Sequence, residues 1–110
     1  MEARTDLMRG TLDLLILRSL MSTPLHGLGI ARRIGQLTQG SFDVKPGSLF
    51  PALYRLEERG LVTAKWGESD TKRRAKFYQL TRLGKKQLQT EEANWRRIAV
   101  AMGHALGSTS

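Results

Sequence analysis

The segment KPGSLFPALYRLEERGLV, residues 45–62, constrains the fold of this chain most strongly. Pro46 suits the first position of a helix, where its missing N–H would have had no partner. Gly60 suits the position just past a helix end. Between these two residues the apolar side chains recur at the spacing of one helical face: Leu49, Ala52, Leu53 and Leu56. The segment therefore predicts an amphipathic helix that packs on a core through one face only.

The flanking sequence predicts three more helices and two strands. Apolar residues at helical spacing predict two helices before this one, over 10–21 and 27–37, separated by a turn at STPLHG. Alternating residues over 61–66 and β-prone residues over 75–81 predict a hairpin around a polar turn at 67–74. The last segment, 82–106, has a long helical pattern, and Thr81 suits its N-cap.

This order of elements predicts a mainly α protein with a small β-hairpin, a winged helix-turn-helix followed by a long C-terminal dimerisation helix. We expect a flexible N-terminus over 1–8, the winged domain over 9–81, the dimerisation helix over 82–106 and a disordered tail over 107–110. On this arrangement Trp66, at the end of the first strand, is predicted to lie in the core.

Positive charge is concentrated in one block of the sequence. Of the 18 Lys and Arg residues, eleven lie between residues 45 and 86, with four of the ten Asp and Glu residues, so this block carries +7 of the net +8. A solvated basic surface would explain the excess, but a contiguous block is more typical of a nucleic-acid footprint.

The composition also excludes several classes of protein. There is no cysteine, there are only two histidines, and no glycine-rich phosphate loop is present, so we expect no metal site, no cofactor and no enzymatic activity. The longest apolar run, LLIL, is far shorter than the roughly 20 residues that a membrane span requires. These features indicate a cytoplasmic protein that does not associate with membranes.

The predicted helix over 46–59 has the diameter to enter a DNA major groove. Its outward face and the cations of the hairpin then supply candidate contacts to bases and phosphates. Arg32 and Arg33, on the preceding helix, are weaker candidates. The candidate DNA-binding residues are Lys45, Ser48, Phe50, Pro51, Tyr54, Arg55, Lys72, Arg73, Arg74 and Lys76.

The chain resembles the PadR family of transcriptional regulators. The resemblance rests on RGTLDLLILRSL, LHGLGIARRI, PGSLFPALYRLEERGLV and KRRAKFYQLTRLGKKQL, and it covers roughly residues 9–106. It is most similar to the short subgroup with a single C-terminal helix. The resemblance implies a homodimeric repressor on a near-palindromic operator, and a non-specific architectural nucleic-acid binder is the alternative. This chain departs from the family at Leu28 and Phe50, where tyrosine is usual.

A stripe at coiled-coil spacing on the last helix, together with the first helix, is the predicted dimer interface. Its residues are Leu12, Leu88, Trp95, Ile98 and Met102. Trp95 has two interpretations, interface core or a platform for a small aromatic effector, the second being implied by the family resemblance. Pro51 also has two: a kink that aims the helix, or a flat apolar contact to a thymine methyl group.

Overall fold

The computed structural model describes the backbone of residues 2–107 and the side chains of residues 10–107. The described chain forms four helices, α1 (Glu2–Ser19), α2 (Gly27–Leu37), α3 (Pro46–Glu58) and α4 (Arg82–Leu106). Three strands, β1 (Leu25–His26), β2 (Val62–Glu68) and β3 (Arg74–Leu80), form one antiparallel sheet in the order β1-β3-β2. The expected flexible segment falls on residues whose side chains are outside the described part, and the expected tail lies almost wholly beyond Gly107.

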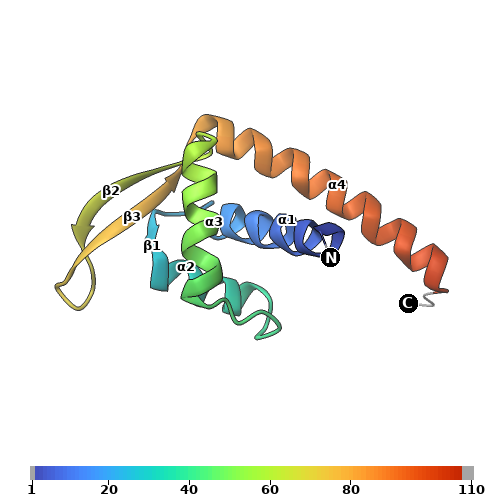
Figure 1. Cartoon of the computed structure of the whole chain (residues 1–110), viewed down its shortest axis with the longest axis horizontal. Helices are drawn as coiled ribbons and strands as arrows, with labels where there is room; N and C mark the ends of the chain where they lie inside the picture. Colours follow the sequence, from blue (N-terminus) through green and yellow to red (C-terminus); the bar gives the residue numbers. More distant parts are fainter. Residues whose placement is uncertain (1, 108–110) are drawn as a thin grey trace.

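The winged helix-turn-helix architecture is confirmed. In Figure 1, α3 crosses in front of α1, the β2–β3 hairpin projects to one side, and α4 runs away on the other. The molecule is elongated, 50 Å along its longest axis against 30 and 27 Å along the others. Because α4 has 25 residues, it is about 37 Å long, and its C-terminal half extends beyond the helical body.

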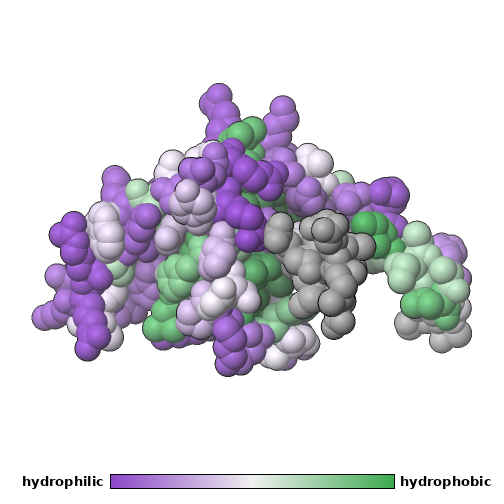
Figure 2. Space-filling view, viewed as in Figure 1, coloured by the Kyte–Doolittle hydropathy of each residue, from purple (hydrophilic) through white to green (hydrophobic). Residues whose placement is uncertain are grey.

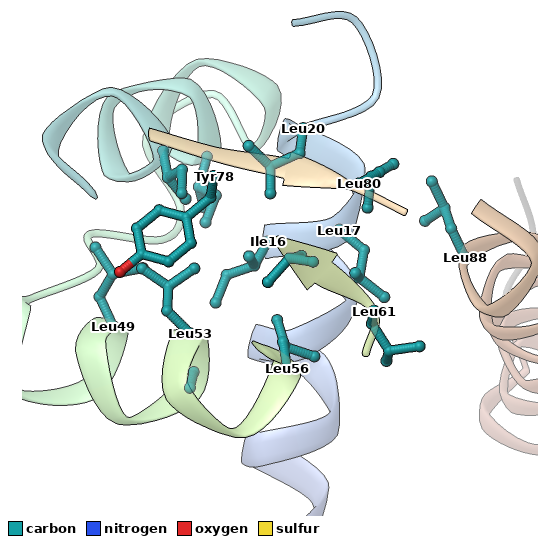
Figure 3. Packing of buried hydrophobic residues seen from close by; sticks show 14 residues of the cluster. Ile16, Leu17, Leu20, Leu49, Leu53, Leu56, Leu61, Tyr78, Leu80 and Leu88 are labelled. Carbon is teal, nitrogen blue, oxygen red and sulfur yellow. The ribbon is translucent and has the colours of Figure 1, made fainter. Parts of the chain in front are cut away.

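The core lies where α1, α2 and α3 meet the base of the sheet (Figure 3). The stripe predicted for α3 is buried in full, against α1 and α2. Ser19 is the buried polar residue of this region, and its hydroxyl donates to the Ile16 carbonyl at 2.6 Å. The remaining members of the core come from the other elements: Ile16, Leu17, Leu20, Ile30, Ile34, Leu61, Val62, Tyr78, Leu80 and Leu88.

Local signals in the sequence fix the ends of the helices. The predicted bounds of α2 and α4 coincide with the observed ones, and α3 begins at Pro46 as expected. Gly60 has φ +74°, which favours glycine, and ends α3. Thr81 caps α4, because its hydroxyl accepts the Gly84 N–H at 2.9 Å and donates to the Gly60 carbonyl at 2.7 Å.

Strand β1 was not expected from the sequence. Its two residues fall in the predicted turn, and they pair with the far edge of β3, Leu25 opposite Tyr78 and His26 opposite Phe77. His26 also caps α2, since its Nδ1 accepts the Gly29 N–H at 3.1 Å. The short strand therefore ties the N-terminus of α2 to the wing.

The base of α4 is packed tightly on the winged domain. A Cβ atom added at Gly84 would collide with the Leu61 carbonyl oxygen and lie 3.0 Å from its carbon. Leu88, one turn farther along, is only 3% exposed and belongs to the core of the single chain. The expectation that Leu88 lies in the dimer interface is therefore wrong. Among the helices of residues 2–107, none has the length and hydrophobicity that crossing a membrane requires.

Candidate nucleic-acid interface

Helix α3 presents an exposed face on the side opposite its buried stripe. Tyr54 is 66% exposed, and Gly47, Ser48 and Pro51 are also exposed. Lys45 holds the N-cap position without a side-chain cap, and its ammonium lies 2.7 Å from Asp43 in a surface ion pair. A helix that packs through one face and exposes the other is the form in which this fold offers a helix to a groove.

A groove of about 370 Å³ lies between the start of α2 and the wing, and Phe50 is the residue of α3 that lines it. Phe50 is 49% exposed. A Cβ atom added at Gly27 would lie 2.7 Å from the Phe50 ring, so the ring occupies space that glycine leaves open. The lining combines apolar, basic and acidic side chains, among them Leu28, Phe50, Tyr78, Arg32, Arg73, Lys76 and Asp70.

The tip of the wing is an ordered turn rather than an open loop. The Ser69 N–H donates to the Arg73 carbonyl at 2.8 Å, and the Lys72 N–H donates to the Ser69 carbonyl at 2.8 Å. Lys72 has φ +60°, a conformation that allows the chain to reverse here. Lys72, Arg73 and Arg74 are all exposed, and Glu68 and Asp70 lie nearby in the sequence. Arg73 faces the groove toward α2, whereas Lys72 and Arg74 lie on the side of Trp66.

The chain matches known proteins over most of its length. Residues 16–90 match the Transcriptional regulator PadR-like family. The chain belongs to that family. An uncharacterised protein from Lysinibacillus sphaericus is 32% identical over 95 residues, which cover 86% of this chain and 87% of that protein.

Solved structures of PadR-like proteins share the fold. A transcriptional regulator from Clostridium thermocellum is 26% identical, with a TM-score of 0.79 over 90% of this chain and 93% of that one. A PadR family transcription regulator from Clostridium difficile is 30% identical, with a TM-score of 0.75 over 86% of this chain and 97% of that one. This PadR-like protein is therefore a DNA-binding transcriptional regulator and not an enzyme.

Trp66 is not a core residue of this PadR-like protein. Its side chain is 58% exposed, and the Arg74 guanidinium lies 5.1 Å from the centre of its ring. The alternation along β2 is as predicted, with Val62 buried and Ala64 half-buried on the same side. However, the hairpin extends past the core before it reaches Trp66, so the inward-facing side has nothing left to pack on.

Lys76 is held between the wing and α3. Its ammonium lies 3.7 Å from the Glu57 carboxylate and 5.8 Å from the centre of the Tyr78 ring. Burial raises the pKa of the Tyr78 phenol, and the positive charge of Lys76 partly offsets that rise. Lys76 is thus less available to a phosphate than the three cations at the tip.

Arg55 does not point outward from α3 as expected. Its guanidinium donates to the Asp13 carboxylate of α1 at 2.9 Å, and both side chains are largely buried, at 32% and 15% exposure. This contact places Arg55 on the flank of α3 that faces α1. Arg55 therefore acts first as a link between α3 and α1, and the expectation that it lies on the outward face is wrong.

A double-mutant cycle measures this link. Because the pair is half-buried, we expect Arg55→Ala and Asp13→Ala to show a coupling energy of about 1 kcal/mol in denaturant unfolding. The matched control is the Asp43–Lys45 pair, which is as close but 78% and 72% exposed, and its coupling is expected near zero. Equal coupling energies for the two pairs would contradict a structural role for Arg55.

The part of the predicted dimer stripe on the C-terminal half of α4 is exposed or half-buried. Trp95 and Met102 are each 51% exposed, and Ile98 is half-buried. Hydrophobic colour follows this part of the helix in Figure 2. Leu12 of α1 is half-buried and packs against the core cluster. The stripe thus begins inside the domain, at Leu88, and continues uncovered beyond it.

Helix α1 supports the start of α4 near this stripe. The Arg18 guanidinium lies 3.2 Å from the Glu92 carboxylate, so an ion pair joins the two helices that the sequence predicts to dimerise. Within the described residues, no group of three or more His, Asp or Glu side chains is placed to hold a metal ion.

Proposed function

We propose that this PadR-like protein is a homodimeric repressor that binds a near-palindromic operator. Each subunit inserts α3 into one of two successive major grooves, and each wing contacts the adjoining backbone. The observation that carries the proposal is the exposed face of α3 beside a wing tip with three adjacent exposed cations, Lys72, Arg73 and Arg74.

The side chains fall into two groups with different tasks. Those on the outward side of α3, namely Ser48, Phe50, Pro51 and Tyr54, are exposed and uncharged, which suits contact with base edges. Those of the wing are cationic, which suits contact with phosphates. Lys45, at the N-terminus of α3, is exposed and can join the phosphate contacts by exchanging its Asp43 partner for DNA.

The exposed stripe on α4 supports the dimer. Trp95, Ile98 and Met102 continue the face that Leu88 buries within the chain, and two-fold pairing would cover them. In this proposal Trp95 also serves as a platform for a small aromatic effector. A large exposed ring on a dimerisation helix can stack on a flat aromatic effector, and binding there would reduce operator affinity by reciprocal coupling.

Selection of bound duplex from a random or genomic pool at controlled salt tests the proposal. We expect enrichment of one inverted repeat, with half-site centres about one helical turn apart or a multiple of it. Enrichment of no sequence would favour the architectural alternative. Reporter expression from a promoter carrying the selected site then distinguishes repression from activation.

The wing is expected to control the salt dependence of binding. Arg73→Ala should weaken binding to the selected site and to random duplex by a similar factor, because phosphate contacts carry no sequence information. The slope of log K against log salt should decrease by about 0.9 for each phosphate contact removed. Fluorescence anisotropy between 50 and 200 mM salt measures it. Arg97→Ala, an exposed arginine of α4 remote from the wing, is the control; an equal slope change there would argue against the wing.

A further inference from the structure

The centre of the outward face of α3 carries no cation. At 100° per residue, the direction opposite the buried stripe is occupied by Gly47, Pro51, Tyr54 and Glu58, all exposed. Arg55 is turned toward Asp13, 2.9 Å away. Bidentate recognition of guanine by arginine, the commonest specific base contact, is therefore not available from this face.

In the N-terminal half of α3 the flank toward the wing is apolar. Phe50 is 49% exposed, and its ring lies over Gly27, where a Cβ atom would leave it too little room. Leu28, 63% exposed, lines the same groove from the first turn of α2. Pro51 follows Phe50 directly. In Figure 2 the surface around the middle of α3 is pale to green, whereas the wing is purple.

The major groove displays one apolar group at the base edges, the C5 methyl of thymine. A protein that brings Pro51, Phe50 and Leu28 to that groove buries apolar surface only where such a methyl is present. Gly47, with nothing within 4 Å of an added Cβ, allows the helix backbone to come close as well. The hydroxyls of Ser48 and Tyr54 remain for hydrogen bonds to phosphates or to base edges.

From this we infer that α3 recognises thymine methyl groups through Pro51 and Phe50, with Leu28 at the edge of the contact. The operator half-site then has A·T pairs beneath the middle of α3. This inference rests on the proposed function, since it specifies what the same face binds.

Thymine can be replaced by deoxyuridine without altering any hydrogen-bonding group, so only the methyl is lost. We expect each contacted thymine to lose about fourfold in affinity on this replacement, the value of one buried methyl group. Replacement at symmetric positions in both half-sites should lose about 16-fold. Thymines outside the half-sites, replaced in the same way, are the DNA control.

Protein variants identify which side chains carry the discrimination. In Pro51→Ala and Phe50→Ala, the ratio of affinities for thymine and deoxyuridine operators should fall toward one. Pro51→Ala restores a backbone donor to α3, so the helix should fold at least as well. Arg73→Ala, a wing variant, should weaken binding to both operators and keep their ratio.

The outcomes are distinguishable. A selective loss at half-site thymines that disappears in Pro51→Ala supports the inference. A preferred site that is bound equally with thymine or deoxyuridine overturns the inference and leaves the proposed function standing. Selection that yields no preferred site overturns the proposed function, and the inference with it.

Discussion

Replacement of Gly84 by alanine is expected to destabilise the fold by about 3 kcal/mol or more, at the upper end of what overpacking costs. The added methyl would collide with the Leu61 carbonyl oxygen. That oxygen cannot retreat easily, because it accepts the Thr81 N–H at 3.1 Å. Gly84 cannot retreat either, because its own N–H is held by the Thr81 hydroxyl at 2.9 Å.

Thermal and denaturant unfolding at fixed protein concentration measure this effect. For a domain of this size we expect the midpoint to fall by more than about 10 °C. Gly35→Ala in α2 is the matched control, because an added Cβ there meets nothing within 4 Å. It should be neutral or stabilising by up to about 1 kcal/mol. If Gly84→Ala and Gly35→Ala unfold at the same midpoint, the base of α4 is not tightly packed against Leu61.

Replacement of Met102 by glutamate is expected to dissociate the proposed homodimer. Two-fold symmetry places the new carboxylate in the interface twice, and each would lose water without gaining a partner. A monomer contacts one half-site only, so affinity for the full operator should fall at least about 100-fold through lost avidity. Sedimentation and operator binding measure the two effects, and circular dichroism checks that the helices remain.

Val100 provides the control on the same helix. It is 60% exposed, as apolar as Met102, and lies about 160° around α4 from it. Val100→Glu should therefore remain dimeric and bind the operator normally. A dimeric Met102→Glu variant would place the interface elsewhere, and dissociation by Val100→Glu would place it on the opposite face of α4.

Local sequence signals were sufficient for most of the fold. Helix α3 is predicted by the spacing of its apolar residues, by Pro46 at its start and by Gly60 past its end. Thr81 predicts the start of α4. Each of these signals acts within a few residues, so it can be recognised without knowledge of the tertiary structure. Gly84 lies in KRRAKFYQLTRLGKKQL, one of the segments on which the family resemblance rests, and its close approach to Leu61 supplies a physical reason for glycine there.

Two of the errors, at β1 and at Arg55, share one cause, since each depends on a partner remote in sequence. Strand β1 is only two residues long, and β3, its partner, lies some 50 residues away. Arg55 is drawn from the outward face by Asp13, 42 positions earlier. The helical spacing grouped Arg55 with the outward residues, and it cannot show that an acidic residue of α1 draws the side chain away from that face.

Trp66 and Leu88 mark the limits of the core. Both follow a pattern that is correct locally, β alternation for Trp66 and helical spacing for Leu88. The pattern tells which side of an element is apolar, but it does not tell how far the body of the domain extends beneath it. The core ends before Trp66 on β2, and it continues as far as Leu88 on α4.

The positions of the two tryptophans give the protein a separate optical signal at each end. Trp66 is exposed on the wing beside Arg74, and Trp95 is exposed on the protruding part of α4. The sequence contains no other tryptophan. A variant that keeps Trp66 alone emits from the wing, and one that keeps Trp95 alone emits from α4. Events at the two surfaces can thus be timed separately in these two variants without attaching a dye.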